Sequence, residues 1–222
     1  MIDVGVGNSK NWSICLREKQ TINDRRYIAL SHRWGESMSE TLKDNIDSRK
    51  NSINHADLPT NFQDAIEVTR QLGIRYLWID SLCIIQDDPE DWRRESRLMG
   101  DVFNSAYCTI SVRVTSGPGF LTNHYDRKCV RLPYRKHSSL YICEQIDDFS
   151  KDVEDAALSN RGWVFQERVL SRRTLYFTDH QVYWECGVCI RCETLTRMEK
   201  YVGYPYPLTG KLLTITDRVD DQ

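Results

Sequence analysis

The chain has 222 residues, of which 40% are hydrophobic and 28% are charged, and its formal net charge is −2. A chain of this length and composition can bury a core of its own, which disfavours both a disordered protein and a small disulfide-dependent one. The 30 basic and 32 acidic residues nearly balance, so generic nucleic-acid binding is also disfavoured.

No apolar run approaches the roughly 20 residues of a membrane-spanning helix, and residues 1–20 lack the order of a signal peptide. We therefore expect no membrane span and a cytoplasmic location. In such a setting the eight cysteines fit reduced thiols better than a disulfide framework.

Short apolar runs alternate with helical patterns in the first half of the chain. After a polar, irregular start with one short strand at residues 12–16, buried strands are predicted at 27–31, 75–80 and 107–112. Helices are predicted at 58–73 and 89–104, because each has a proline at its start and apolar residues at helical spacing. The polar segment 36–57 reads as a long loop.

This alternation predicts an α/β fold with a doubly wound, mostly parallel sheet and helices on both faces. Ligands of such sheets bind at the carboxyl ends of the strands, here residues 31–35 and 80–87. A C-terminal β-hairpin extension is predicted from strands at 174–177 and 181–185. A strand at 140–143 and a short helix at 162–170 precede it.

The second predicted helix places one acidic residue among apolar ones. At about 100° per residue, Trp92, Met99, Val102 and Phe103 form one stripe, and Glu95 falls inside it. A carboxylate on a buried face is costly unless it is paired or lies in a cleft. Two interpretations stand: an internal ion pair with an arginine, or a catalytic carboxylate in a pocket with a raised pKa.

Polar side chains also follow the first two predicted strands. Arg33 can hold a phosphate or a carboxylate, and Trp34 can stack on a base, although a packed Trp beside a surface Arg is the structural alternative. Asp80 can face a ligand or accept backbone N–H groups at a turn. Gln86 and Asp87 are secondary candidates in the same loop.

The segment Arg161-Gly-Trp-Val-Phe-Gln-Glu-Arg168 gathers further candidates, Arg161, Trp163, Gln166 and Glu167, around one short helix. Glu167 can pair with Arg161 or with a substrate. The alternative, which we favour, is a buried polar network that docks this region onto the sheet.

Cys186, Cys189 and Cys192 form two overlapping Cys-x-x-Cys pairs, with His180 as the nearest further ligand. A zinc site normally has two separated pairs, or one pair with spaced histidines. We therefore expect thiols here and no resident cofactor, and keep zinc as the weaker hypothesis.

Several segments together resemble the fungal heterokaryon-incompatibility (HET) domain, in the order of that family and over about residues 27–190. They are Tyr27-Ile-Ala-Leu-Ser-His-Arg-Trp-Gly35, Leu58-Pro59 with Asp64-Ala-Ile66, Arg75-Tyr-Leu-Trp-Ile-Asp-Ser-Leu-Cys-Ile-Ile-Gln-Asp87, Asp91-Trp-Arg-Arg-Glu95 with Met99 and Ala106, Arg161 to Arg168, and Val182-Tyr-Trp-Glu-Cys186. His32 departs from the many members that have Tyr there. The resemblance implies an N-terminal extension (1–26), a HET domain (27–195) and a tail or linker (196–222).

The HET resemblance implies a role in fungal non-self recognition and programmed cell death. HET domains are in turn distantly similar to TIR domains, which implies a TIR-like or flavodoxin-like fold. Many TIR domains cleave NAD with a Glu on a helix just after a Trp. Trp92 and Glu95 stand in an analogous place, at a spacing of three instead of four. The similarity also implies self-association or association with other death-signalling domains.

Together these considerations lead to a hypothesis of nucleotide cleavage, with NAD as a substrate. Glu95 would act electrostatically on the ribose as nicotinamide leaves. The candidate substrate-binding residues are Ser31, Arg33, Trp34, Asp80 and Trp92. The rival is a non-catalytic module, in which the same residues form a packed polar core and cell death follows from recruiting partners.

Overall fold

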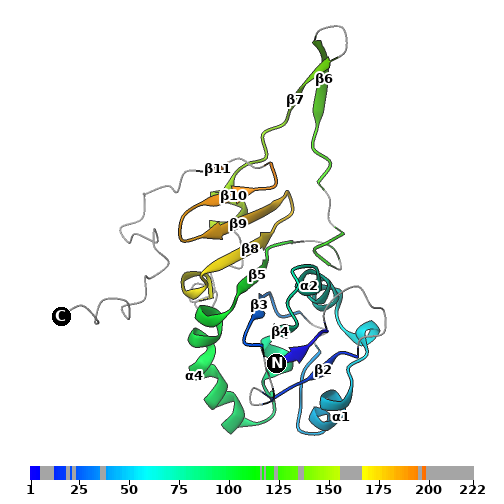
Figure 1. Ribbon diagram of the computed structural model, residues 1–222, viewed down its shortest axis with the longest axis vertical. Coiled ribbons are helices and arrows are strands. Elements are labelled where there is room, and N and C mark those ends of the chain that lie inside the picture. Colours follow the sequence, from blue (N-terminus) through cyan, green and yellow to red (C-terminus); the bar gives the residue numbers. More distant parts are fainter. Residues whose placement is uncertain are drawn as a thin grey trace, which may run out of the picture.

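The computed structural model describes residues 1–5, 13–18, 21, 24–35, 39–115, 117, 119–122, 125–134, 138–155, 167–194 and 197–198. A nine-stranded sheet has the order β11-β10-β9-β8-β5-β3-β4-β1-β2, and β6 and β7 form a separate hairpin (Figure 1). The strands of the large sheet are β1 (Ile2–Asp3), β2 (Cys15–Leu16), β3 (Tyr27–Ser31), β4 (Tyr76–Trp78), β5 (Cys108–Val112), β8 (Arg173–Phe177), β9 (Val182–Cys186), β10 (Ile190–Cys192) and β11 (Arg197–Met198).

The centre of the sheet is parallel, with β4, β3, β5 and β8 side by side. From β3 the chain passes to β4 on one side and then crosses back over β3 to β5 on the other. Connections that diverge in this way are typical of doubly wound sheets, whose ligands bind at the carboxyl ends of the strands. The predicted α/β class with a mostly parallel central sheet is therefore confirmed, whereas the closer TIR-like or flavodoxin-like assignment stays a prediction.

The two faces of this sheet carry different helices. Alternate residues of β3, Ile28 and Leu30, pack in one apolar cluster with Phe62 and Ile66 of α2 (Thr60–Gln71). The intervening residues of β3 pack in a second cluster with Phe103 of α4 (Pro89–Ser105). Because neighbouring strand residues point to opposite faces, α2 and α4 cover opposite sides, as Figure 1 shows.

The ends of both long helices follow the sequence signals. The side chain of Asp88 accepts hydrogen bonds from the backbone N–H groups of Glu90 and Asp91 at the start of α4, with Pro89 in the first turn. Gly73 follows α2 with φ of 68°, a left-handed conformation that favours glycine at the residue past a helix end. The predicted helices at 58–73 and 89–104 are confirmed within two residues.

The N-terminal segment is more ordered than its polar composition predicts. β1 pairs with β4 and with β2, so its described residues extend the antiparallel edge of the sheet. Ile2 and Val4 are fully buried in the core. Asp3 is also buried, and Arg75 binds its carboxylate through two nitrogens at 2.9 and 2.8 Å. The expectation of an irregular start is wrong here, because two-residue strands are too short to show any alternation.

The expected loop at 36–57 contains regular structure in its described part. α1 (Ile46–Asn51) and the 3-10 helix η2 (His55–Asp57) lie in it, and neither has a buried residue. A helix that buries no face carries no apolar stripe, so periodicity could not reveal it. The following α3 (Asp80–Cys83) is a single turn after β4.

A two-stranded arm projects from the body of the molecule (Figure 1). It consists of β6 (Cys129–Tyr134) and β7 (Ser138–Cys143), which pair antiparallel from Cys129 opposite Cys143 to Tyr134 opposite Ser138. A disulfide joins Cys129 to Cys143, and the other six cysteines are thiols. The expectation of reduced thiols is therefore wrong for this pair. The strand predicted at 140–143 is confirmed, but its partner β6 was not predicted.

The predicted C-terminal hairpin is present as β8 and β9, and β10 and β11 extend it antiparallel at the other edge of the sheet. A π-helical turn, η3 (Ser150–Glu154), packs Phe149 and Val153 against this part of the sheet. Apart from 197–198, residues 196–222 lie outside the described residues. None of the helices described has the length and apolar character needed to cross a membrane.

Candidate functional site

Trp34 and Asp80 meet where β3 and β4 end. The indole Nε1 of Trp34 donates a hydrogen bond to Asp80 Oδ2 at 2.7 Å. The other oxygen, Oδ1, accepts from the backbone N–H of Ser81 at 2.8 Å, which fixes the carboxylate at the start of α3. Trp34 is 40% exposed, so part of its ring faces solvent. Two predicted residues therefore come together, and Asp80 orients Trp34; the neighbouring Arg33 is exposed.

Gln86 and Asp87 shape the loop after α3. The side-chain nitrogen of Gln86 donates to the carbonyls of Asp80 and Ile84 at 3.2 and 3.0 Å. Asp87 accepts from the backbone N–H of Lys43 at 2.9 Å. Both side chains thus bind backbone groups, which makes them supports of the loop that carries Asp80.

Ser31 and Glu167 link two motif segments that lie far apart in the sequence. The hydroxyl of Ser31, the last residue of β3, donates to Glu167 Oε2. Ser31 is 3% exposed, and Glu167 lies in the helical residues 167–170, of which Leu170 packs in the same apolar cluster as Phe103 of α4. This contact supports the favoured interpretation of a docking network. The companion candidates Arg161, Trp163 and Gln166 lie outside the described residues.

A second part of this network lies on the hairpin and was not predicted. Thr174 of β8 pairs with Glu185 of β9, and Tyr176 lies two residues along on the same face. The Tyr176 hydroxyl donates to Glu185 Oε2 at 2.6 Å, and Arg168 Nε lies 3.6 Å from that oxygen. Burial, followed by the charge of Glu185, raises the pKa of the Tyr176 phenol. The phenol therefore stays protonated and serves as a donor.

Two cations accompany these acids: Arg168, whose side chain is 17% exposed, and Arg113, which is buried. Arg168 contacts Glu154 Oε1 at 3.1 Å as well as Glu185. Arg113, which follows β5, is 5% exposed, and its Nε donates to Ser111 Oγ at 3.1 Å. Burial lowers the pKa of Arg113 from its very high ordinary value. The sequence held a signal for this group, because side chains alternate between the two faces of a strand. In β5 and β9 this alternation places Arg113 and Glu185 on a face of the sheet that is covered.

Glu95 does not lie in a sealed pocket. Its side chain is 26% exposed, and Arg94, which is itself 63% exposed, contacts it through Nε at 3.1 Å. The acid that α4 buries is Asp91, which accepts from the backbone N–H of Ile85 at 2.9 Å and pairs with Arg94.

Trp92 is 51% exposed, so its expected place in the apolar stripe is wrong. The apolar cluster on this face takes Met99, Val102 and Phe103 from the second half of α4. The first turns of the helix lie beyond that packed region, and Trp92 therefore has no place in the core.

The three clustered cysteines lie around the turn between β9 and β10. The Sγ of Cys192 lies 2.9 Å from Thr194 Oγ1, and Cys186 Sγ contacts the carbonyl of Cys189 at 3.6 Å. His180 bonds to Asp152. Across the part of the chain that the structure describes, no group of three or more His, Cys, Asp and Glu side chains is arranged to hold a metal ion. The zinc hypothesis therefore gains no support from the geometry.

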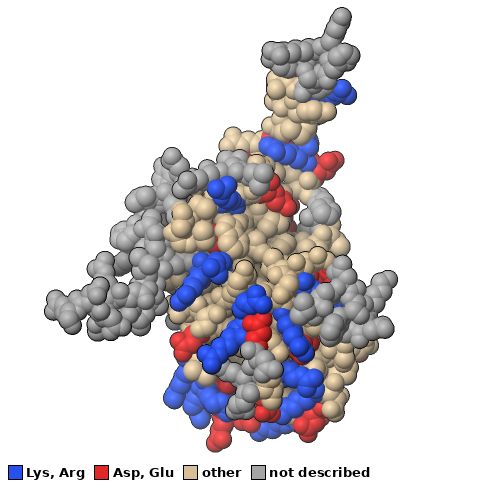
Figure 2. All heavy atoms as spheres, in the orientation of Figure 1, with Lys and Arg blue, Asp and Glu red and all other residues tan. Residues whose placement is uncertain are grey.

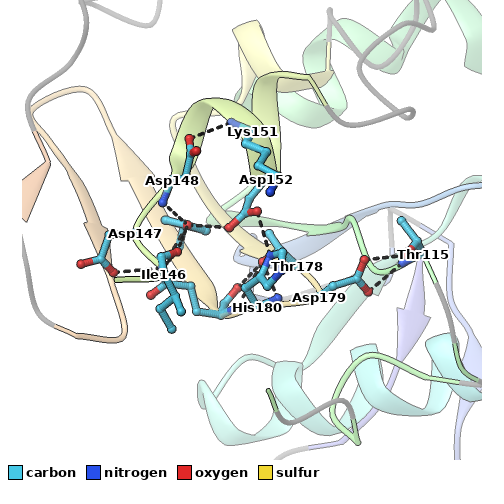
Figure 3. Close-up of polar contacts among 11 residues, drawn as sticks. Thr115, Ile146, Asp147, Asp148, Lys151, Asp152, Thr178, Asp179 and His180 are labelled. Carbon is cyan, nitrogen blue, oxygen red and sulfur yellow. Dashed lines mark hydrogen bonds and ion pairs between the residues drawn. The ribbon is translucent and has the colours of Figure 1, made fainter. Parts of the chain in front are cut away.

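A polar pocket of about 290 Å³ lies at the base of the arm, and none of its lining residues was predicted to form a pocket. Figure 3 shows the polar contacts among several of these residues. Asp152 binds His180 Nδ1 at 2.9 Å and the Tyr183 hydroxyl at 2.7 Å, and Tyr183 sits on β9. Asp147 accepts from the side-chain nitrogen of Gln181 at 3.0 Å. Both carboxylates therefore find hydrogen-bond donors within the protein. These hydrogen bonds join the segment that follows the arm to β9.

Comparison with known proteins agrees with this arrangement of motifs. The family model of the heterokaryon incompatibility protein (HET) matches residues 27–167, which is more than half of the chain. The chain belongs to the HET family. Heterokaryon incompatibility protein 6, OR allele, of Neurospora crassa is 34% identical over an alignment of 91 residues, which covers 36% of this chain and 13% of that protein. No solved structure matches the chain. The HET match begins at β3 and ends at Glu167, so it contains both residues of the Ser31–Glu167 contact.

Proposed function

We propose that this HET domain serves fungal incompatibility as an effector that triggers cell death, and that it does so by cleaving NAD or a related nucleotide. The observation that supports a nucleotide is the Trp34–Asp80 hydrogen bond of 2.7 Å. It holds a partly exposed indole at the carboxyl edge of the parallel strands, where ligands of such sheets bind. A fixed aromatic ring can stack on a base or a nicotinamide, and the adjacent Arg33 can neutralise phosphates.

Glu95 is the proposed catalytic carboxylate. Its partial exposure leaves an oxygen accessible, and its contact is with a surface arginine instead of a buried one. In the reaction the bond between nicotinamide nitrogen and ribose C1′ breaks, water adds to C1′, and nicotinamide, ADP-ribose and a proton are released. A nearby carboxylate lowers the barrier by stabilising the positive charge that develops on the ribose. Self-association of the domain is the proposed means of completing the site.

The test is nicotinamide release from NAD by the purified chain, compared with Glu95→Gln and with Glu90→Gln. Glu90 is an exposed acid on the same helix and provides a matched control. We expect Glu95→Gln to lower kcat by about 100-fold, the effect of removing one electrostatic stabiliser, and Glu90→Gln to leave it unchanged. We expect Trp34→Ala to raise KM. Full activity of Glu95→Gln, or no release by a folded wild type at high concentration, would refute the proposal.

A second candidate function is a non-catalytic module that acts by recruiting partners. The internal pairs favour it: Ser31 with Glu167, and Arg168 with Glu185, satisfy polar motif residues within the chain. A death assay in fungal cells separates the two functions. If the domain acts by catalysis, Glu95→Gln must abolish both cell death and the loss of cellular NAD. If the domain acts by recruitment, Glu95→Gln must kill cells as the wild type does, and the cellular NAD level must stay constant.

A further inference from the structure

Two cysteines lie directly opposite each other beside the turn that joins β9 to β10. The register of these strands pairs Ile190 with Glu185, so the next pair toward the turn is Cys189 with Cys186. The backbone N–H of Cys186 donates to the carbonyl of Cys189 at 3.0 Å. Hydrogen-bonded partners in antiparallel strands have Cα atoms about 5.5 Å apart, within the range that a disulfide spans. The two sulfurs can therefore be joined without a change of register.

The third cysteine of this cluster faces the other way. Cys192 lies opposite Tyr183 on β9, packs with it in the same apolar cluster and is 5% exposed. Side chains alternate between the faces of a strand, so Cys192, three residues after Cys189, points to the opposite face. Of the two overlapping Cys-x-x-Cys pairs, only Cys186 with Cys189 therefore has both sulfurs on one face.

This pair is open to solvent at the turn. Cys186 and Cys189 are both partly exposed, and the two residues between them are exposed, with Val188 at 78%. Charged side chains of both signs crowd the lower body of the molecule, whereas the surface over β8 to β10 is mostly uncharged (Figure 2). Such surroundings suit a small neutral reactant better than a charged one.

The hydrogen bonds around Cys186 favour its thiolate. Burial acts to raise the pKa of this thiol, but hydrogen bonds from the backbone N–H groups of Val188 and Cys189, and from the side chains of Cys189 and Trp184, bring the pKa below its ordinary value. The opposite holds for Cys83, whose pKa is raised by burial. Because the thiolate is the nucleophilic form of cysteine, Cys186 is the better attacking sulfur.

We propose that Cys186 and Cys189 form an oxidation site, in which Cys186 reacts with hydrogen peroxide and Cys189 converts the product to a disulfide. The Cys186 thiolate attacks one peroxide oxygen, the O–O bond breaks and hydroxide leaves, so Cys186 becomes a sulfenic acid. The Cys189 sulfur then attacks the Cys186 sulfur, the S–O bond breaks, and water leaves with the thiol proton. In total the two thiols lose two electrons and two protons, and the peroxide becomes two molecules of water.

This site is independent of the proposed nucleotide chemistry. The pair lies on the C-terminal hairpin, whereas Trp34 and Asp80 lie at the ends of β3 and β4. Oxidation of the pair can therefore be measured whether or not the domain cleaves NAD.

The experiment is treatment of the purified full chain with hydrogen peroxide, followed by alkylation of the remaining thiols and digestion with trypsin without reductant. Trypsin cleaves after Arg191, so mass spectrometry finds Cys186 and Cys189 on one peptide and Cys192 on the next. A disulfide within the pair lowers the mass of one peptide by two hydrogen atoms, whereas a bond to Cys192 links two peptides. Cys189→Ser removes the resolving thiol, and Cys192→Ser is the matched control.

We expect the wild type and Cys192→Ser to lose alkylation at Cys186 and Cys189 together. In Cys189→Ser the sulfenic acid should persist at Cys186 and be captured by dimedone. Without peroxide at pH 7, iodoacetamide should alkylate Cys186 at least about tenfold faster than Cys83, which is also partly exposed. Unchanged circular dichroism would establish that the variants fold.

Three results would overturn the proposal. The first is a wild type whose Cys186 and Cys189 are alkylated after peroxide as fully as before it. The second is a disulfide that links the two tryptic peptides, because Cys192 would then be the partner. The third is a purified wild type that contains zinc and whose pair reacts only after a chelator is added, which would make the cluster a metal site.

Discussion

The hydroxyl of Ser31 donates a hydrogen bond to the carboxylate of Glu167, although 136 residues separate the two in the chain. Ser31 ends the first parallel strand, and Glu167 lies in the helical residues 167–170. The contact therefore joins the two ends of the HET match across the central sheet.

Removal of this contact should destabilise the fold. We expect Ser31→Ala to lower the free energy of unfolding by about 1 to 2 kcal/mol, because a largely covered carboxylate loses a donor. In a double-mutant cycle with Glu167→Ala, measured by urea unfolding, the coupling energy should be about 1 kcal/mol. Ser48 is exposed and serves as the control: the changes in unfolding free energy caused by Ser48→Ala and Glu167→Ala should add, with no coupling energy. Strict additivity of the Ser31 and Glu167 variants would contradict the contact.

Asp3 should make stability depend on pH in the acid range. Burial acts to raise its pKa, but hydrogen bonds from Arg75 and the backbone N–H of Gly5, with the charge of Arg75, lower it below its ordinary 3.8. Because the folded pKa is the lower one, the stabilisation is present above about pH 4 and is lost as the pH falls through the folded value. We expect Asp3→Asn to cost about 1 to 3 kcal/mol at pH 7.

The measurement for this prediction is urea unfolding of wild type and Asp3→Asn at several pH values. The difference between the two should narrow below about pH 4. Asp126→Asn, which removes the charge of an exposed aspartate, should show no such pH-dependent difference at these values. If the difference in unfolding free energy between Asp3→Asn and wild type stayed constant down to pH 2, the charge of Asp3 would not be what stabilises this edge of the sheet.

Gly119 is closely packed against α2. A Cβ at this position would collide with Asp64 Oδ2 and Thr60 Cγ2, and Asp64 already accepts from the backbone N–H groups of Phe120 and Leu121. We therefore expect Gly119→Ala to lower the free energy of unfolding by about 1 to 3 kcal/mol. Thermal or urea unfolding measures it. Gly187→Ala, where nothing lies within 4 Å of the added Cβ, is the control and should be tolerated.

The disulfide should stabilise the arm more than the body. Cys129 and Cys143 are 14 residues apart, and closing such a loop is worth about 3 kcal/mol to the closed segment. We expect reduction, or the pair of substitutions Cys129→Ser and Cys143→Ser, to speed chymotrypsin cleavage within the arm. The unfolding midpoint of the body should change little, because the arm is a separate sheet.

The double serine variant also serves as the control for reduction. If reductant speeds cleavage of that variant as much as that of the wild type, the effect of the reductant does not come from breaking the Cys129–Cys143 bond. Equal protection of the arm in oxidised and reduced wild type would show that the hairpin does not need the cross-link.

Local sequence determined the framework of this protein. The apolar runs that became β3, β4 and β5 were readable because buried parallel strands are apolar on both faces. Proline and the capping side chain of Asp88 marked the start of α4, and Gly73 marked the end of α2, since these residues act on backbone groups within one turn. The HET family was also readable, because its motifs are contiguous stretches of residues.

Only the tertiary structure decided which polar residues meet. Periodicity placed Glu95 and Trp92 on the inner side of α4, yet both are partly exposed, because periodicity gives a direction around the helix and not the extent of the sheet beneath it. The pairing of Trp34 with Asp80, and of Ser31 with Glu167, depends on strand order in the sheet. Strand order follows from packing over the whole chain, so contacts between distant residues cannot be read from either segment alone.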